Sequence, residues 1–265
     1  MQRIELHRAD VVLSCLVGGP ASAPPVLLLH GLAGAALELT PTALALTDRF
    51  RVVVPDARGH GHSTRRPVDL SRRAFVADAA FVVSELCGGG PAFVAGQSMG
   101  GHTAMLLAAW HPELVSRLVM LEAGVGGMAP DDDYPARLGR WFAGWPVPFA
   151  SRAAAEEFLG GTATARAWAS DLEPASDGLR PRFDADVMEA SIRPVASQAR
   201  WDEWASIAAP TVLIRGSRGT CPAEEDARMR ALRPSVGYEV IADAGHDAHL
   251  DQPAAWLELL HTAGL

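Results

Sequence analysis

Short apolar runs recur along the chain, and helix-like stretches separate most of them. Continuous runs of β-branched and aliphatic residues are typical of strands buried on both faces. The predicted strands cover residues 11–17, 26–29, 51–54, 92–95, 118–121, 211–215 and 238–241. The predicted helices cover residues 40–46, 71–86, 99–110, 223–232 and 252–260, with Ser71 as the expected N-cap of the second. This alternation predicts an α/β fold whose mostly parallel central sheet is flanked by helices.

The alternation stops between about residues 124 and 195, where no convincing strand is present and several aromatic residues gather. Ser151 follows a proline-containing segment and can begin a helix, and Gly160 and Gly161 can end it. We therefore predict a core formed by residues 1–124 and 196–265, interrupted by a helical cap at residues 125–195. That organisation explains how 265 residues can resemble nearly two domains without a linker.

The composition excludes several kinds of chemistry. All 23 Lys+Arg residues are Arg, so no protein lysine can form a Schiff base or complete a GxxxxGKS or GxxxxGKT phosphate-binding loop. The net charge of -8 and the lack of basic runs disfavour nucleic-acid and anionic-membrane partners. Cys15, Cys87 and Cys221 lack metal-ligand spacing. We expect reduced thiols, no metal and no cofactor.

The sequence also carries expectations about location and partners. No apolar run approaches the roughly 18 residues of a membrane span. The first ten residues carry charges instead of the apolar centre of a secretion signal. We therefore expect a cytoplasmic protein whose partner is a small-molecule substrate, with no membrane or nucleic-acid partner. The sequence leaves the oligomeric state open.

The most specific motif is Gly96-Gln97-Ser98-Met99-Gly100, a G-x-S-x-G that follows a predicted strand and begins a predicted helix. Glycines permit the tight turn that pushes the serine hydroxyl out of the backbone path. The amides at the start of a helix can stabilise a developing anion. In this context Ser98 is the predicted nucleophile.

A second motif, His30-Gly31-Leu32, ends an earlier predicted strand. A tetrahedral intermediate needs backbone N–H groups that face the nucleophile, and the amides of Leu32 and Met99 are the predicted oxyanion hole. We expect His30 to be a structural or pocket residue instead of the base, because the base should arrive from the last strand. His30 and Gly31 are therefore assigned to substrate binding.

A third motif, the loop from Gly245 to His249, lies just beyond the last predicted strand. A serine hydroxyl is a weak nucleophile until an imidazole within hydrogen-bond reach takes its proton. His246 is the favoured base, since Gly245 lets the loop turn immediately before it. His249 is the alternative base, although a packing or capping role suits it better.

These motifs together resemble the α/β-hydrolase family. The His30-Gly31 pair, the segment Asp56–Ser63, the Gly96–Gly100 turn and the Gly245-His246 pair have the order and the intervals of that family. The resemblance implies an α/β-hydrolase fold over about residues 8–124 and 196–260, with a lid or cap in the insertion. It also implies a triad of nucleophile, acid and base in that chain order.

One position departs from the family pattern. Family members most often carry the acid, an aspartate, a few residues past the penultimate strand, and here Gly219 or Thr220 occupies that place. Glu122 ends the strand after the nucleophile helix, which is the acid position of some haloalkane dehalogenases and lipases. We therefore hypothesise that Glu122 is the acid. The alternative is that Glu122 only caps a loop or pairs with an arginine of the cap.

Ser98 favours acyl chemistry, because dehalogenases and epoxide hydrolases of this family attack with a carboxylate. The predicted function is hydrolysis of an ester, thioester or lactone bond of a small, largely hydrophobic molecule through an acyl-enzyme. A carbon-carbon bond hydrolase and a non-hydrolytic lyase or acyltransferase of specialised metabolism stay open. So does a catalytically silent ligand-binding protein. Trp141, Trp145 and Trp168 are candidate substrate-binding residues of the cap, and the alternative is that they form the cap's own core.

Overall fold

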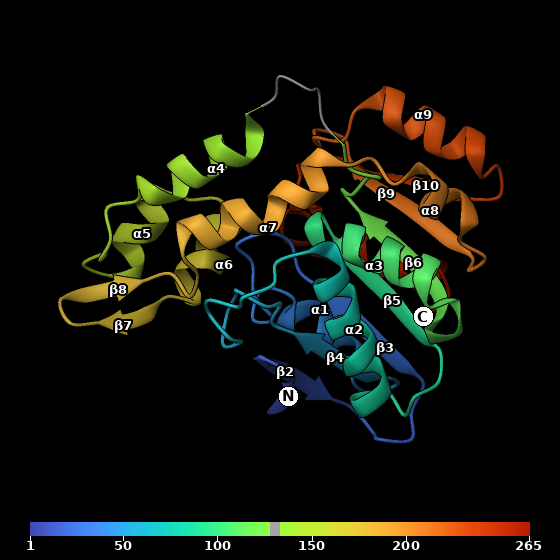
Figure 1. The fold of residues 1–265 in the computed structure, drawn as a ribbon, viewed down its shortest axis with the longest axis horizontal. Coiled ribbons are helices and arrows are strands. Elements are labelled where there is room, and N and C mark those ends of the chain that lie inside the picture. Colours follow the sequence, from blue (N-terminus) through green and yellow to red (C-terminus); the bar gives the residue numbers. More distant parts are fainter. Residues whose placement is uncertain (128–132) are drawn as a thin grey trace.

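The computed structural model describes residues 1–127 and 133–265 of the chain (Figure 1). Within these ranges an eight-stranded sheet has the order β1-β2-β4-β3-β5-β6-β9-β10. Its strands are β1 (Gln2–Arg8), β2 (Val11–Gly18), β3 (Pro25–Leu29), β4 (Arg51–Pro55), β5 (Ala92–Gln97), β6 (Val115–Leu121), β9 (Thr211–Gly216) and β10 (Gly237–Ile241). β2 pairs antiparallel with β1 and β4, and the remaining neighbours are parallel. The predicted fold class is confirmed.

Each strand expected from an apolar run is present, and its residues lie within the observed bounds. The structure adds β1, an edge strand that pairs with β2 from Gln2 opposite Val17 to Arg8 opposite Val11. Its residues are half-buried or exposed, so charged and polar side chains interrupt the apolar signal that marks the central strands. An edge strand with one wet face needs no continuous apolar run.

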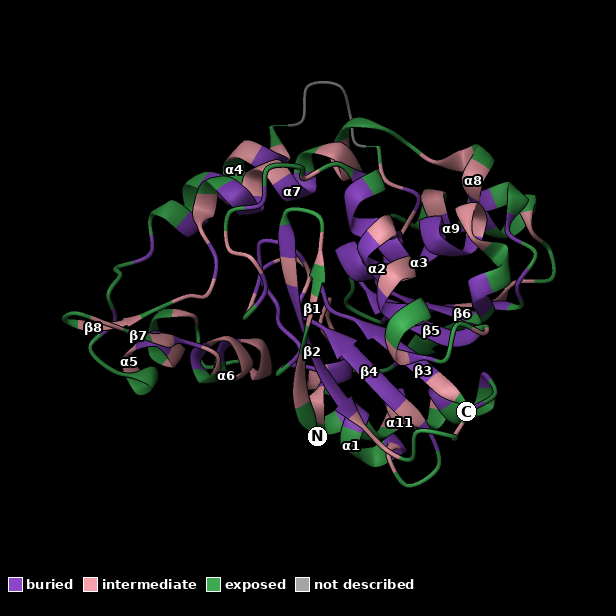
Figure 2. Cartoon of the chain, turned by 60° about the horizontal axis from the view of Figure 1, so that its bottom comes forward, coloured by how far each residue is buried: buried purple, intermediate pink, exposed green. Residues whose placement is uncertain are grey.

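Helices cover both faces of the sheet and create two hydrophobic layers. They are α1 (Thr40–Leu46), α2 (Arg72–Leu86), α3 (Met99–Trp110), α8 (Trp201–Ser206), α9 (Ala223–Leu232), α10 (Ala248–Asp251) and α11 (Pro253–Thr262), with a 3₁₀ turn at Pro112–Leu114. Val82 of α2, Leu106 of α3 and Trp204 of α8 are buried in one layer. Leu46 of α1 and Leu260 of α11 are buried in the other. Figure 1 shows α2 and α3 on the near face, and Figure 2 shows the buried strands between the layers.

Residues 134–197, called the cap segment here, lie to one side of the sheet (Figure 1). They form α4 (Tyr134–Ala143), α5 (Arg152–Phe158), α6 (Ala163–Ser170), the hairpin β7 (Glu173–Ala175) and β8 (Gly178–Arg180), and α7 (Ala185–Ser197). The Ser151 hydroxyl accepts a hydrogen bond from the Ala154 N–H, so α5 begins where the sequence predicts. The hairpin differs from the prediction, because the sequence indicates no strand in this segment. Strands of three residues are too short to show the two-residue alternation of apolar and polar side chains. The division into core and cap at residues 125 and 195 stays a prediction.

The aromatic side chains of the cap segment pack on one another. The ring centre of Trp145 lies 5.7 Å from that of Trp168 and 5.6 Å from that of Phe142. Trp141 completes the group at 6.1 Å from Trp168 and is 46% exposed. Such pairs contribute beyond simple area burial, so these rings form a core for the cap segment itself.

Ion pairs join the cap segment to the loop that follows β4. Arg65 contacts Asp184 at 2.7 Å and Glu173 at 3.0 Å, and Arg66 contacts Asp184 at 2.6 Å. These side chains are partly exposed, so each pair contributes modestly to stability.

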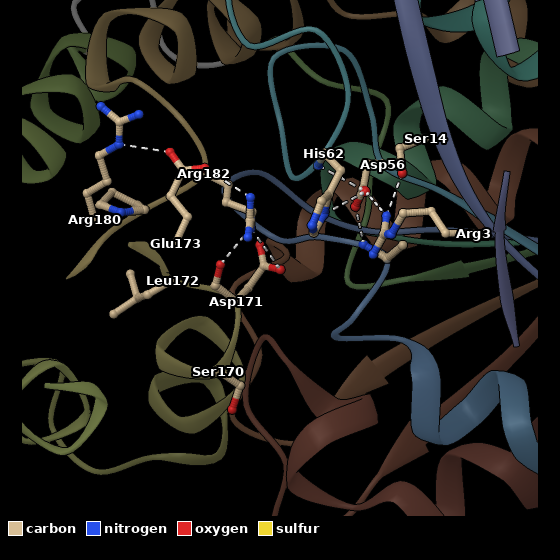
Figure 3. A network of polar contacts seen from close by, with 12 residues as sticks. Arg3, Ser14, Asp56, His62, Ser170, Asp171, Leu172, Glu173, Arg180 and Arg182 are labelled. Carbon is tan, nitrogen blue, oxygen red and sulfur yellow. Dashed lines mark hydrogen bonds and ion pairs between the residues drawn. The ribbon is translucent and has the colours of Figure 1, made fainter. Parts of the chain in front are cut away.

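A second row of charges lies along the same seam between the cap segment and the core. Figure 3 shows Arg182, which contacts Asp171 and Glu173 of the cap segment, beside the Arg3, Asp56 and His62 group of the core. Burial and the Asp56 charge raise the pKa of Asp171 to about 6. The seam is therefore polar and charged, unlike the two layers of the core.

Candidate active site

Ser98 lies at a strained turn between a strand and a helix. It follows β5 directly and precedes α3, with φ of 52° and ψ of -121°. A positive φ at a residue other than glycine stores strain and is found at sites where geometry serves function. Small residues allow the turn: a Cβ on Gly100 would lie 2.4 Å from the carbonyl oxygens of Leu29 and His30. The motif therefore packs the start of α3 against the end of β3 and holds the serine clear of both.

The backbone amides of Leu32 and Met99 are the predicted donors of the oxyanion hole. Neither the Leu32 N–H nor the Met99 N–H donates a hydrogen bond within the part of the chain that the structure describes. Met99 is the first residue of α3, where backbone donors have no partner inside the helix. A Cβ on Gly31 would lie 3.3 Å from the Ser98 Cβ, so this loop passes close to the nucleophile. The Met99 amide follows Ser98 directly and the Leu32 amide follows Gly31, and their role as the oxyanion hole stays a prediction.

His246 lies in the loop after β10 and is held there by Gln97, the residue before the nucleophile. The Gln97 side-chain amide donates to the His246 carbonyl at 3.1 Å and to the Asp247 carboxylate at 3.0 Å. Thr164 of α6 donates to the other Asp247 oxygen at 2.7 Å. Among the described residues, no hydrogen bond joins the Ser98 hydroxyl to His246; such bonds are often long before substrate binds.

Glu122 follows β6 with φ of 47°, and it is 2% exposed. One carboxylate oxygen accepts the Gly216 N–H at 2.9 Å, and the other accepts the Thr220 N–H at 2.8 Å. That second oxygen lies 3.4 Å from His246 Nδ1. Glu122 thus caps the turn after β9 and also faces the imidazole, and its role as the acid stays a prediction.

Burial and hydrogen bonds shift the pKa values of this pair in opposite directions. Burial alone would raise the pKa of Glu122, but the contacts from His246, Thr220 and Gly216 outweigh it and hold the pKa below its ordinary value. Burial alone would lower the pKa of His246. The hydrogen bond to Glu122 and the Asp247 charge outweigh burial and raise it. An ionised carboxylate therefore stabilises the imidazolium form of His246.

The two other histidines of the predicted motifs make separate contacts. His30 Nε2 accepts the Ala57 N–H at 2.9 Å, so Nδ1 carries the proton and donates to the Gly31 carbonyl at 2.7 Å. His249 Nε2 lies 3.0 Å from Glu38 Oε1, and both side chains are buried. Both ring nitrogens of His30 form hydrogen bonds to the main chain, so its role here is structural. The contact with Glu38 gives His249 a packing role.

Ser98 lines a pocket of about 490 Å³ beside α7. Its polar lining comprises Ser98, His102, Glu122, Thr220, Cys221 and Glu225, and its apolar lining includes Met99, Ile192, Val195 and Ala196. Sequence reasoning missed His102, which lies one helical turn after Ser98; that spacing was the available signal. Burial and the charges of Arg72 and Arg200 hold the pKa of His102 well below its ordinary value, so its ring is neutral.

The residues predicted to bind substrate lie outside this lining. Trp141 packs in the aromatic cluster, and Trp145 and Trp168 line a separate void of about 10 Å³ beside Glu38. His30 lines another void of about 30 Å³, between the end of β3 and helix α2. Gly31 lies beside Ser98 but is not part of the pocket wall. The tryptophans pack together because large aromatic side chains bury most area against each other, and their role in binding stays a prediction.

No group of three or more His, Cys, Asp or Glu side chains in residues 1–127 and 133–265 is arranged to hold a metal ion. No helix in the same ranges has the length and the apolar character needed to cross a membrane.

A mostly parallel sheet, a strained serine between β5 and α3, and a histidine loop after the last strand define an α/β hydrolase. The chain belongs to the alpha/beta hydrolase family, whose model matches residues 26–259. It is therefore a hydrolase of this family.

Characterised relatives cover most of the chain. The mouse (Mus musculus) sn-1-specific diacylglycerol lipase ABHD11 is 28% identical over 258 residues, which are 92% of this chain and 81% of the relative. The 2-(acetamidomethylene)succinate hydrolase of Mesorhizobium japonicum is 26% identical over 247 residues, covering 90% and 87%. The solved structure of E-2-(acetamidomethylene)succinate hydrolase superimposes with a TM-score of 0.84 at 25% identity, covering 98% of each chain. A thioesterase domain from the curacin biosynthetic pathway shares the fold, with a TM-score of 0.81 at 22% identity and coverage of 98% and 99%.

Proposed function

We propose that the protein hydrolyses an ester, thioester or lactone bond of a small, largely hydrophobic molecule through an acyl-enzyme on Ser98. One observation carries the proposal. Ser98 lines the same pocket as Glu122, which lies 3.4 Å from His246, and among the described residues the neighbouring Met99 amide donates to no other group. The proposed nucleophile, the acid and the oxyanion donor Met99 thus line one cavity, and the acid contacts the base.

The proposed reaction has two displacements. His246 Nε2 takes the proton of the Ser98 hydroxyl while its oxygen attacks the carbonyl carbon. The Leu32 and Met99 amides stabilise the oxyanion, and Glu122 stabilises the imidazolium. His246 then gives the proton to the leaving oxygen or sulfur. Water, activated by His246, attacks the acyl-enzyme, and the proton returns to Ser98 as the acid is released.

The substrate class rests on the pocket and on the relatives. Met99, Ile192, Val195 and Ala196 give one side of the cavity an apolar surface, which suits an acyl chain or an apolar ring. The diacylglycerol lipase relative is named for an ester substrate. A free small molecule as partner, rather than a membrane or a nucleic acid, and a cytoplasmic location belong to the same proposal; the free thiols Cys15 and Cys87 fit a reducing compartment.

Covalent labelling tests the nucleophile. A fluorophosphonate probe should label the wild-type protein at Ser98, identified by peptide mass spectrometry. Labelling should disappear in Ser98→Ala and fall strongly in His246→Ala. His249→Ala is the matched histidine control and should label like the wild type. An unlabelled wild-type protein would overturn the proposal and favour the ligand-binding alternative.

A substrate panel tests the bond type. Matched acyl esters, thioesters and lactones of increasing chain length should be turned over with loss of activity in Ser98→Ala. A β-diketone probe distinguishes the carbon-carbon hydrolase, and release of an unsaturated product without uptake of solvent ¹⁸O distinguishes a lyase. Turnover of the diketone alone would refute the ester assignment.

A further inference from the structure

The side chain of Thr220 lies between the two groups that are proposed to act together. Its hydroxyl oxygen is 2.8 Å from His246 Nδ1 and 3.5 Å from Glu122 Oε2. The direct separation of the imidazole nitrogen and the carboxylate is 3.4 Å. The best-formed hydrogen bond of His246 Nδ1 is therefore to the threonine hydroxyl and not to the carboxylate.

The ionised carboxylate determines the direction of these hydrogen bonds. Glu122 can only accept, and its charge disfavours a lone pair directed at it. If the Thr220 hydroxyl donated to His246, Nδ1 would be unprotonated and its lone pair would lie 3.4 Å from the negative charge. If Nδ1–H donates to the Thr220 oxygen, the Thr220 O–H is free to turn to Glu122. In the second arrangement no lone pair of Nδ1 faces the carboxylate, and the Thr220 O–H donates to it. This arrangement therefore has the lower energy.

We propose that Thr220 is a positioning residue of the active site, whose hydroxyl accepts the Nδ1–H of His246 and donates to Glu122. The proposal rests on the proposed triad and extends it by one residue. It leaves Nε2 of His246 unprotonated and able to take the Ser98 proton. When His246 becomes an imidazolium, the hydroxyl links it to the charge of Glu122. No bond other than hydrogen bonds changes at Thr220.

The turn after β9 is built around the Glu122 carboxylate, which explains how Thr220 reaches its place. The Gly216 and Thr220 N–H groups both donate to Glu122. A Cβ on Gly219 would lie 2.0 Å from Glu122 Oε1, so any larger residue there would displace the carboxylate. Because a backbone hydrogen bond fixes its main chain, the Thr220 side chain keeps its position beside His246.

Thr220 is also accessible to substitution. It is exposed and lines the active-site pocket, so exchanging its hydroxyl for a methyl leaves the core layers untouched. Thr220→Val keeps the shape of the side chain and removes only the polar group, whereas Thr220→Ser keeps the hydroxyl. Ser217, in the same turn, accepts the Asp243 N–H at 2.9 Å, which makes Ser217→Ala the matched control.

The first test is kinetic. In Thr220→Val, kcat should fall about tenfold at unchanged KM, while Thr220→Ser and Ser217→Ala stay within about threefold of the wild type. The acid limb of kcat/KM should move to lower pH in Thr220→Val, because the imidazolium loses a hydrogen-bond acceptor. The charged groups around His246, namely Glu122, Asp247 and Glu38, are the same in all variants. A Thr220→Val enzyme with wild-type kcat and an unmoved acid limb would overturn the proposal.

The second test restores an acceptor. In Glu122→Gln, the added Thr220→Asp substitution places a carboxylate where the hydroxyl meets Nδ1, and kcat should recover at least tenfold. A double variant no faster than Glu122→Gln contradicts the placement of Thr220. Fluorophosphonate labelling of wild-type Ser98 separates the two levels of inference. If Ser98 is not labelled, the proposed function fails. If Ser98 is labelled but Thr220→Val leaves kcat and the acid limb unchanged, only the inference about Thr220 fails.

Discussion

Glu122→Gln is the perturbation that tests the site most directly. Both oxygens of the carboxylate accept backbone N–H groups, from Gly216 at 2.9 Å and from Thr220 at 2.8 Å. A glutamine has one oxygen, so its NH₂ group must face one of these donors. An N–H left without an acceptor in a buried place costs about 1–3 kcal/mol. We therefore expect the free energy of unfolding to fall by about that amount.

The expected loss of activity follows from charge. His246 Nδ1 lies 3.4 Å from Glu122, and two unit charges about 4 Å apart interact by about 4 kcal/mol at an effective dielectric constant of about 20. The interaction exists only while the imidazole is protonated, as it is in the transition state. Losing about 4 kcal/mol there lowers the rate roughly thousandfold. The neutral amide should thus affect kcat far more than KM.

The assay combines steady-state turnover of an activated ester with urea unfolding followed by tryptophan fluorescence. Glu225→Gln is the matched control, since Glu225 lines the same pocket and accepts the Val125 N–H at 2.8 Å without contacting His246. The control should stay within about threefold of wild-type kcat. If Glu122→Gln retained a tenth or more of wild-type activity, the assignment of Glu122 as the acid would be refuted.

Three further predictions concern the pH profile, the core and the loop of the base. The pKa of His246 is raised, and the base must be neutral, so kcat/KM should rise with pH through a midpoint above 6.5; a midpoint below 6.5 would contradict the contacts described. Asp78→Ala leaves the buried Arg58, which contacts it at 2.6 Å, without its carboxylate, so urea unfolding should show a loss of about 3–5 kcal/mol. Gln97→Leu removes both hydrogen bonds to the loop of His246, so kcat should fall roughly tenfold and the free energy of unfolding by about 1–3 kcal/mol; an unchanged kcat would show that the loop is held by other contacts.

The sequence predicts the parallel sheet well because buried strands need continuous apolar runs, and the strand ends at Leu29 and Leu121 are marked by abrupt changes to polar residues. It does not predict β1, because charged and polar side chains interrupt the apolar residues of this edge strand. The sequence does not predict the short hairpin of the cap segment either, for another reason. Three residues cannot establish a period of two against the background of neighbouring turns.

The site shows the same division between pattern and geometry. Ser98 and His246 stand in motifs whose local chemistry is readable from the chain, and Glu122 follows from a strand that ends in a carboxylate. The sequence shows Thr220 only as a residue near the usual place of the aspartate, since no pattern reveals that its hydroxyl meets Nδ1 at 2.8 Å. Aromatic content marks Trp145 as important to the cap segment. It cannot reveal whether the ring faces the pocket or its neighbours.

The Asp247 carboxylate joins three segments that are far apart in sequence. One oxygen accepts a hydrogen bond from Gln97 in the nucleophile turn, and the other accepts one from Thr164 of α6. Asp247 itself follows His246 directly in the chain. Any displacement of α6 relative to the core would break the Thr164 contact or move Asp247, the residue next to the base. The placement of α6 and the alignment of the imidazole are thereby coupled through a single carboxylate, although they belong to the cap segment and the core.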